Sequence, residues 1–312
     1  MEKLSNNNKR IVMVGCLETG WEVVRYLLEN KIEISYFVCL TPEKAKQQKV
    51  AGYESFQDLA THYNIPVYYA QQYSLKSDAD ILFFRDQKFD LLIQGGWQRL
   101  FPEEILETIS IGAIGIHGSS ELLPKGRGRS PINWSIIQNK KRFIIQYFLI
   151  KAGVDDGDIF YFESFDINEW DTCRTLYYKN SIVTKRVLVK WIPELLKNKF
   201  QVVPQVGAPT YYPKRTVEDG LINWDFTVLD IYNLIRAITH PYPGAFSRIT
   251  DAKITIWKAF PFDSQILYPE AKYGEVVEVF KTGDFVVNAN GGSLLITEYE
   301  FPRKIEIGFH LF

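Results

Sequence analysis

Near its N-terminus the chain reads Arg10-Ile11-Val12-Met13-Val14-Gly15-Cys16, an apolar run that ends at a glycine. The apolar residues that follow, Val23, Val24, Leu27 and Leu28, recur with helical spacing. A continuous apolar run of this length predicts a buried strand, and the spacing after it predicts a helix that packs on the strand. We therefore expect the ordered chain to begin with a strand, a tight turn and a helix.

Short apolar runs and helical patterns keep alternating through the first half of the chain. We expect strands at residues 32–38, 65–69, 91–94 and 113–116, and helices near residues 56–59 and 102–106. This alternation is typical of a Rossmann-like α/β fold, a mainly parallel sheet with helices on both faces. Because such sheets bind ligands beyond the carboxyl ends of their strands, we expect Gly15, Gly95-Gly96 and His117 to converge on one cleft.

The second half moves from helical patterns to short strands. We expect strands at residues 143–150 and 159–163, a long helix at 172–196, and a helix from Thr227, which forms a capping pair with Asp230. From Gly244 on, short strands separated by glycine turns predict a small antiparallel, OB-like β domain. The expected division is a catalytic domain at 1–205, a linker and docking helix at 206–243, and a β-rich domain at 244–312.

The composition limits the classes of partner. The chain has 312 residues and a formal net charge of -1, so it has no overall field that would gather nucleic acid. Three widely spaced cysteines indicate buried thiols in a reducing compartment. No signal peptide and no membrane-spanning run is evident, so we expect a cytoplasmic protein without nucleic-acid or membrane partners, with a homodimer as a possible assembly.

One of the four histidines has unusual surroundings. His117 ends a predicted strand among glycine and serine, directly before a loop rich in basic residues and proline, and Asp155 follows further along the chain. A histidine with a carboxylate partner is a common proton acceptor near neutral pH. A satisfied structural histidine is the alternative that these residues leave open.

The glycine-rich segments indicate ligand binding less clearly. Lys125, Arg127 and Arg129 lie among glycines before a predicted helix, where they would bind an anion or remain solvated, and Lys214 presents the same choice. The turn from Gly15 to Gly20 has the spacing of neither the dinucleotide fingerprint nor the P-loop, which favours a structural turn.

At these residues the sequence resembles the 10-formyltetrahydrofolate-dependent formyltransferases. The family pattern is matched, in order, by His117, Ser119, Leu123-Pro124, Arg127-Gly128-x-x-Pro131 and Asp155-x-Gly157-x-Ile159. The agreement continues in residues 214–224 and 236–245, so it spans most of the chain.

The resemblance implies roles for individual residues. His117 would accept a proton from the attacking amine, Asp155 would orient and stabilise the imidazole, and no metal would be needed. The cosubstrate, 10-formyltetrahydrofolate, would contact Gln94, Gly95, Gly96, Trp97, Leu123 and Asp156. The acceptor substrate would contact Ser119, Lys125, Arg127, Arg129, Tyr211 and Lys214.

Within the family, the sequence favours the branch that formylates nucleotide-linked amino sugars for bacterial surface polysaccharides such as the O-antigen of lipopolysaccharide. The segment Gly95-Gly96-Trp97-Gln98-Arg99-Leu100 is similar to that branch, and residues 41–52 lack the arginines of the tRNA enzymes. Methionyl-tRNA formylation, formyltetrahydrofolate hydrolysis and non-catalytic binding of folate or sugar nucleotide are the alternatives.

One position departs from the family pattern. Gly115 stands where the family has an asparagine that is thought to hold the formyl oxygen. Loss of one such donor costs about 100- to 1000-fold in rate. Either another donor, such as a backbone N–H or Gln94, replaces it, or the activity is low.

Overall fold

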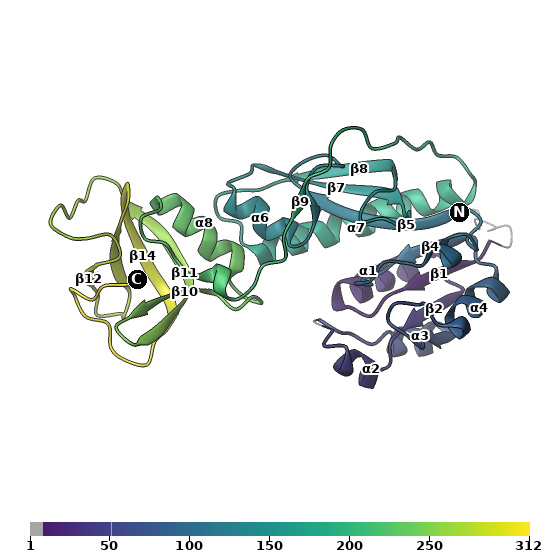
Figure 1. Cartoon of the computed structure of the whole chain (residues 1–312), viewed down its shortest axis with the longest axis horizontal. Coiled ribbons are helices and arrows are strands. Elements are labelled where there is room, and N and C mark those ends of the chain that lie inside the picture. The colour runs from purple at the N-terminus through teal and green to yellow at the C-terminus, as the bar shows by residue number, and fades with distance from the viewer. Residues whose placement is uncertain (1–8, 51) are drawn as a thin grey trace. The chain divides into compact units, whose positions relative to one another are not determined.

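The computed structural model describes residues 9–50 and 52–312, and within these ranges seven strands form one sheet in the order β3-β2-β1-β4-β5-β7-β8 (Figure 1). The strands are β1 (Ile11–Val14), β2 (Tyr36–Cys39), β3 (Val67–Tyr69), β4 (Leu91–Gln94), β5 (Gly112–Ser119), β7 (Arg142–Leu149) and β8 (Asp158–Asp166). Neighbours from β3 to β5 are parallel, and β7 is antiparallel to β5. The expected Rossmann-like sheet is confirmed, with an antiparallel extension beyond β5.

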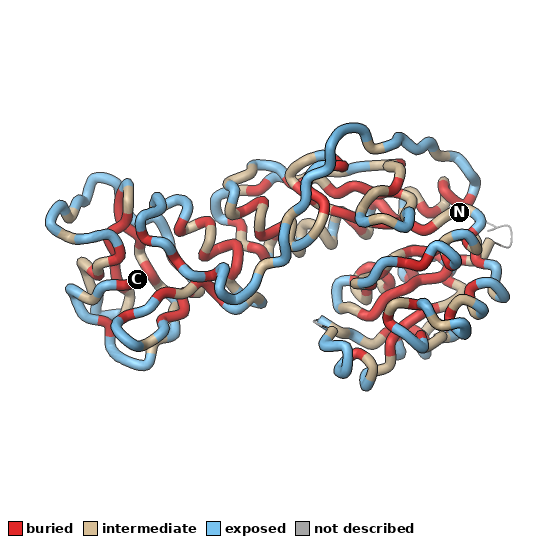
Figure 2. The backbone as a smooth tube through the Cα atoms, in the orientation of Figure 1, coloured by how far each residue is buried: buried red, intermediate tan, exposed pale blue. Residues whose placement is uncertain are grey.

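The centre of this sheet is covered on both faces. All four residues of β1 are fully buried, which requires packing against both sides of the strand. Val12 and Val14 join a core cluster with Phe84 and Ile105 from two helices on one face, while the opposite-facing Phe37 of β2 meets Phe56 edge to face. Figure 2 shows the central strands as buried segments.

The helices of this part are α1 (Glu18–Glu29), α2 (Pro42–Gln47), α3 (Gln57–Tyr63), α4 (Asp78–Gln87), α5 (Glu103–Leu106), α6 (Pro131–Ile137) and α7 (Cys173–Leu196). Two of them, α2 and α4, were not expected from the sequence. The second strand is shorter than expected, because the chain leaves α1 through Lys31 in a left-handed conformation and Ile32 and Ile34 lie in the connection to β2. Both isoleucines are nevertheless buried.

Five strands of the described chain form the second sheet, in the order β10-β11-β14-β13-β12. They are β10 (Ala245–Ile249), β11 (Ala252–Asp263), β12 (Val276–Val279), β13 (Phe285–Ala289) and β14 (Gly292–Glu300), and each pairs antiparallel with its neighbours. Gly283 and Gly291 occupy the turns on either side of β13 with positive φ, as the turn residues predict. Helix α8 (Val228–Ile238) precedes the sheet and is capped by the Thr227 side chain, which accepts from the Asp230 amide.

The C-terminal residues connect both edges of the second sheet. Leu311 bridges to Ile249 at the end of β10, and His310 bridges to Glu275 just before β12. These bridges join the edge strands and give the sheet the character of a small barrel. The expected antiparallel C-terminal β domain is therefore confirmed.

The chain divides into two compact units. The first comprises the described residues up to Arg127 together with Ile144–Ser164 and Lys179–Thr210, and the second comprises Gly128–Phe143, Phe165–Tyr178 and Tyr211–Phe312. Strand β6 (Arg127–Gly128) spans one of these boundaries and strand β9 (Tyr211–Tyr212) begins at another, while the 3-10 helix η1 (Glu218–Gly220) lies within the second unit. In the part of the chain that the structure describes, no helix combines the length and apolar character needed to cross a bilayer.

Candidate active site

His117 lies near the end of β5 with its side chain on the same face of the sheet as Gly115 and Ser119. In the antiparallel register, His117 is opposite Gln146 of β7 and Gly115 is opposite Phe148. His117 is 7% exposed and Gln146 is fully buried. The buried imidazole therefore lies beside Gln146 of the neighbouring strand, close to the end of β5.

Both ring nitrogens of His117 have partners. Nδ1 lies 3.3 Å from Oδ2 of Asp155, and Nε2 lies 2.7 Å from the carbonyl oxygen of Gly126. A carbonyl oxygen only accepts, so Nε2 carries a hydrogen in this arrangement. The expected histidine–aspartate pair is thus brought together, and Nε2 becomes a proton acceptor only when the ring hydrogen lies on Nδ1, facing Asp155, and the Gly126 carbonyl no longer faces Nε2.

The loop that carries Gly126 is held by hydrogen bonds on two sides. On the strand side, Gln146 Oε1 accepts from the Leu123 amide at 2.8 Å, and Ser119 Oγ accepts from the Glu121 amide at 3.3 Å. On the other side, the Thr210 hydroxyl accepts from the Gly126 amide at 2.8 Å. Ser119 and Leu123 are buried and Lys125 is exposed.

Sequence reasoning missed the residues that hold this loop. Gln146 and Thr210 carry no motif, and the Gly126 contact is made by a backbone carbonyl, which has no sequence signature. The apolar run of β7 was a usable signal for Gln146 alone, because the glutamine is a polar residue inside an otherwise apolar strand.

The loop of Asp155 is built on small residues. Asp155 has a positive φ of 49°, and a Cβ at Gly157 would lie 1.8 Å from the Leu149 carbonyl oxygen, so only glycine fits there. A Cβ at Gly153 would lie 2.2 Å from Oδ2 of Asp156. The Oδ1 atom of Asp156 is buried and has no hydrogen-bond partner among the described residues.

The position of the family asparagine is closed in this chain. A Cβ at Gly115 would lie 2.5 Å from the Phe148 ring and 2.8 Å from Ile150. Because Phe148 is buried, a side chain at position 115 requires this ring to move. The face beside His117 is thus packed around a glycine and an aromatic ring.

Four glycines form a tight contact where β1, β4 and α1 meet, which we call the glycine junction. A Cβ at Gly15 or Gly20 would lie 2.0 or 1.8 Å from the Gly95 carbonyl oxygen. A Cβ at Gly95 would meet the Met13 sulfur at 2.5 Å, and Gly96 has a φ of 82°. The packing supports the structural interpretation of the Gly15 turn.

Gln94 and Trp97, two expected folate contacts beside the glycine junction, differ in which atoms a ligand can reach. Gln94 is partly exposed and its Nε2 donates to the Trp97 carbonyl at 2.7 Å. The Trp97 indole is buried in the core, edge to face with Tyr73, and its Nε1 has no hydrogen-bond partner among the described residues. Gln94 is therefore accessible for ligand contact through its side chain, whereas Trp97 offers its backbone.

Of the remaining candidates, Arg127 is buried and belongs to the first unit, whereas Arg129, Tyr211 and Lys214 are exposed and belong to the second unit. Lys214 lines a hollow of about 480 Å³ there, next to Arg215. Burial lowers the pKa of Arg215, which Asp219 opposes, and its guanidinium carbon lies 5.0 Å from the centroid of the Trp134 ring. An arginine has an ordinary pKa far above neutral, so Lys214 and Arg215 bring two positive charges to this hollow at pH 7, and the Glu218 carboxylate, which also lines it, brings one negative charge.

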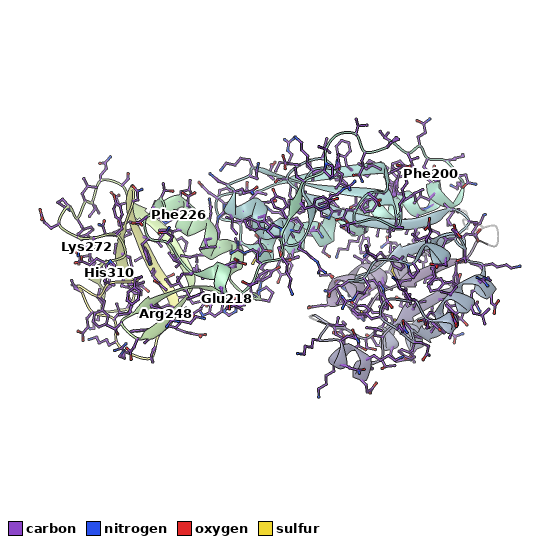
Figure 3. The ribbon with its side chains drawn as sticks, in the orientation of Figure 1. Phe200, Glu218, Phe226, Arg248, Lys272 and His310 are labelled. Carbon is purple, nitrogen blue, oxygen red and sulfur yellow. The ribbon has the colours of Figure 1, made fainter. Side chains whose placement is uncertain are left out.

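A larger hollow of about 950 Å³ lies elsewhere in the second unit. Lys272 and His310, labelled in Figure 3, line it together with Trp224 and Tyr268. None of the residues expected to bind substrate lines this hollow. Residues 9–50 and 52–312 contain no group of three or more His, Cys, Asp or Glu side chains that is suited to hold a metal ion.

Comparison with protein families matches nearly the whole chain. Residues 7–192 match the formyl transferase model, and residues 214–312 match the model of the formyl transferase C-terminal domain. The first match covers the histidine, both loops around it and the glycine junction.

The curated relatives differ in how much of their own length this chain matches. The bifunctional polymyxin resistance protein ArnA of Wigglesworthia glossinidia brevipalpis is 36% identical over 208 residues, which are 66% of this chain and 31% of that protein. The methionyl-tRNA formyltransferase of Bacillus subtilis is 29% identical over 297 residues, 95% of this chain and 91% of that enzyme.

Solved structures share the fold. The N-formyltransferase of Helicobacter canadensis, in complex with folinic acid and dTDP-3-aminofucose, superposes with a TM-score of 0.67 at 18% identity, covering 94% of this chain and 100% of that one. HypX of Aquifex aeolicus superposes with a TM-score of 0.63 at 16% identity, covering 95% of this chain and 45% of that one.

Proposed function

Because the chain belongs to the formyl transferase family, we propose that it moves a formyl group from 10-formyltetrahydrofolate to the amine of a nucleotide-linked amino sugar. Such a product is a building block of bacterial surface polysaccharides. The observation that carries the proposal is the His117–Asp155 pair, set at 3.3 Å in a chain whose family transfers formyl groups.

His117 is the proposed proton acceptor. The amine nitrogen bonds to the formyl carbon, the bond from that carbon to the folate nitrogen breaks, and the proton lost by the amine is matched by one gained by the folate nitrogen. The neutral imidazole, with its hydrogen on Nδ1 facing Asp155 and its Nε2 turned away from the Gly126 carbonyl, takes the first proton at Nε2 and returns it as the second. Asp155 fixes the ring orientation through Nδ1 and stabilises the cation that forms.

The loop after β7 has an atom that suits the formyl donor. A folate carries a pterin ring with N–H donors along one edge, and it supplies the activated formyl group when bound. Asp156 Oδ1, buried without a hydrogen-bond partner in the described structure, is an acceptor of the kind that this edge needs. Gln94, Gly95, Gly96, the Trp97 backbone and Leu123 remain proposed folate contacts.

Two cations support a nucleotide-linked acceptor. Lys214 and Arg215 share one hollow, and a diphosphate is the part of a sugar nucleotide that such a pair would bind. The net charge of -1 argues against an extended polyanion such as tRNA. The sugar nucleotide in the H. canadensis complex, dTDP-3-aminofucose, gives a first substrate class to try.

The test is a substrate panel. Purified protein is incubated with 10-formyltetrahydrofolate and dTDP-, UDP- or GDP-linked amino sugars, and products are analysed by mass spectrometry. We expect one amino sugar to gain the mass of a single CO as tetrahydrofolate appears. Formate release without any acceptor would instead assign the hydrolase reaction.

A second candidate is formyl transfer to methionyl-tRNA. The full-length curated relatives favour it, since enzymes of that name from Bacillus subtilis and Acetivibrio thermocellus are each 29% identical over 95% of this chain. Adding charged initiator tRNA to the same panel separates the two. Formylated methionyl-tRNA with unmodified amino sugars would select this second function.

A further inference from the structure

Residues 203–210, which we call the strap, are attached to the catalytic part of the first unit. Val203 and Ile159 of β8 exchange two backbone hydrogen bonds of 2.9 and 2.8 Å. Thr210 accepts from the Gly126 amide through its hydroxyl and from the Arg127 amide through its carbonyl. The strap crosses the expected boundary between the catalytic domain and the linker, and it spans from the Asp155 side of His117 to the Gly126 side.

Gln205 is the strap residue that turns inward. Residues 203–210 are exposed except for Gln205, whose carboxamide makes three hydrogen bonds. Its Nε2 donates to the carbonyls of Asp155 and Gly157 at 2.7 and 2.8 Å, and its Oε1 accepts from Arg127 Nη2 at 2.6 Å. The partners define the orientation of the amide, because two carbonyls only accept and a guanidinium only donates.

The groups joined by Gln205 belong to the two loops that contact His117. The Asp155 carboxylate lies beside Nδ1, and Arg127 directly follows Gly126, whose carbonyl accepts from Nε2. Asp155 has a positive φ, a conformation that costs free energy in a residue with a side chain and needs support from its surroundings. The two hydrogen bonds from Gln205 to carbonyls on either side of Asp156 provide such support.

We propose that Gln205 is a positioning residue for formyl transfer: it fixes the separation of the Asp155 loop and the Gly126–Arg127 loop, and thereby the orientation of the His117 ring. The inference rests on the proposed role of His117 as proton acceptor. It assigns no contact between Gln205 and either substrate.

The decisive variant is Gln205→Glu. It keeps the shape of the side chain but sets a carboxylate oxygen against two carbonyl oxygens, so the Asp155 loop moves while Arg127 keeps its acceptor. We expect kcat to fall about 30- to 100-fold with KM within about threefold, because displacement of a reacting group by about 1 Å costs on this order. Gln201→Glu, the same change at an exposed position before the strap, should leave kcat within about twofold of wild type.

Four further measurements separate positioning from general stability. The Gln205→Glu change should shift the pH profile of kcat/KM, and it should have little further effect in an Asp155→Ala background, since both act on the same imidazole. Gln205→Met, neutral and of similar size, should lower kcat in the same direction. Thermal unfolding of each variant shows whether it is folded at the assay temperature.

Several outcomes would overturn the proposal. The first is a kcat within about twofold of wild type in folded Gln205→Glu, and the second is an unshifted pH profile of kcat/KM. The third is a double variant, Gln205→Glu with Asp155→Ala, whose loss of kcat equals the product of the two single losses. Failure of both Gln205 variants to fold would also contradict it, by assigning the carboxamide to the fold. A fully active His117→Ala enzyme would instead contradict the proposed function, so the two failures are distinguishable.

Discussion

The glycine junction and the His117 region both lie where neighbouring strands of one sheet end, yet they are built in opposite ways. At the junction, backbone packs on backbone, and a Cβ at Gly20 would come within 1.8 Å of the Gly95 carbonyl oxygen. Around His117, polar side chains such as Gln146 and Gln205 bind loop backbone, and both ring nitrogens have partners. A glycine at a strand end can therefore be a packing requirement as readily as a sign of ligand binding.

The largest expected effect lies in the His117 region. Asp155→Ala should lower kcat about 1000-fold while the free energy of unfolding changes by less than about 1 kcal/mol, because the carboxylate orients the ring and stabilises its cation. Asp158→Ala removes a carboxylate that pairs with a half-exposed lysine, and should leave kcat within about threefold. Steady-state kinetics and urea unfolding measure both effects, and equal losses of kcat in the two variants would contradict a specific role of Asp155 beside His117.

The junction should show the reverse pattern. Alanine normally stabilises an exposed helix by about 1 kcal/mol relative to glycine, but Gly20→Ala should destabilise the protein by about 3 kcal/mol, because its Cβ meets backbone that must shift. Thr19→Ala, at the exposed neighbouring position of α1, should be nearly neutral. Urea unfolding gives the result, and a stabilised Gly20→Ala protein would show that the junction is not packed as described.

Much of the fold follows from local sequence, but the arrangement around His117 does not. Ile11–Val14 reads as a buried strand, and Thr227 with Asp230 reads as a helix start, because each depends on neighbours in the chain. Helix α4 could have been found from Ser77, whose side chain caps the Asp80 amide. The pair of His117 and Asp155 was a hypothesis from the surroundings of His117, and the family resemblance gave the two residues their roles. The partners of Gln205 are 48 to 78 positions away in the chain, a distance over which spacing carries no information.

Gly115 shares a feature with each region: like the junction glycines it is tightly packed, and it lies beside His117, the catalytic candidate. From the sequence alone, Gly115→Asn would preserve or raise the rate if a missing amide limits it. Since a Cβ there would meet the Phe148 ring at 2.5 Å, we now expect a loss of about 2 kcal/mol in stability and about tenfold in kcat. Combining it with Phe148→Ala should cost less than the sum of the two single changes, and full additivity in urea unfolding would contradict the steric explanation.

The smallest effect is expected at the opposite end of β4, away from both regions. Asp90 precedes the strand and accepts from the Arg10 amide, Ser110 and Lys9; burial opposes ionisation, but these hydrogen bonds keep the pKa of Asp90 below its usual value. The contribution of Asp90 to stability is therefore complete above the pKa that this group has in the unfolded chain, about 4. It is lost as the pH falls through the lower pKa that Asp90 has in the folded protein.

Asp90→Asn should accordingly cost about 1 kcal/mol at pH 7 without changing kcat. The difference between wild type and variant in urea unfolding should shrink from pH 7 to pH 3. A difference that grows on acidification would show that the hydrogen bonds do not favour the charged carboxylate.

Chemical rescue of a His117→Ala enzyme tests the proton-transfer role most directly. In single-turnover formyl transfer to the amino sugar identified by the panel, we expect a loss of about 1000-fold with an unchanged unfolding temperature, and partial recovery when free imidazole is added. A rate within about tenfold of wild type in the absence of imidazole would contradict the account, because the amine proton would then have another acceptor.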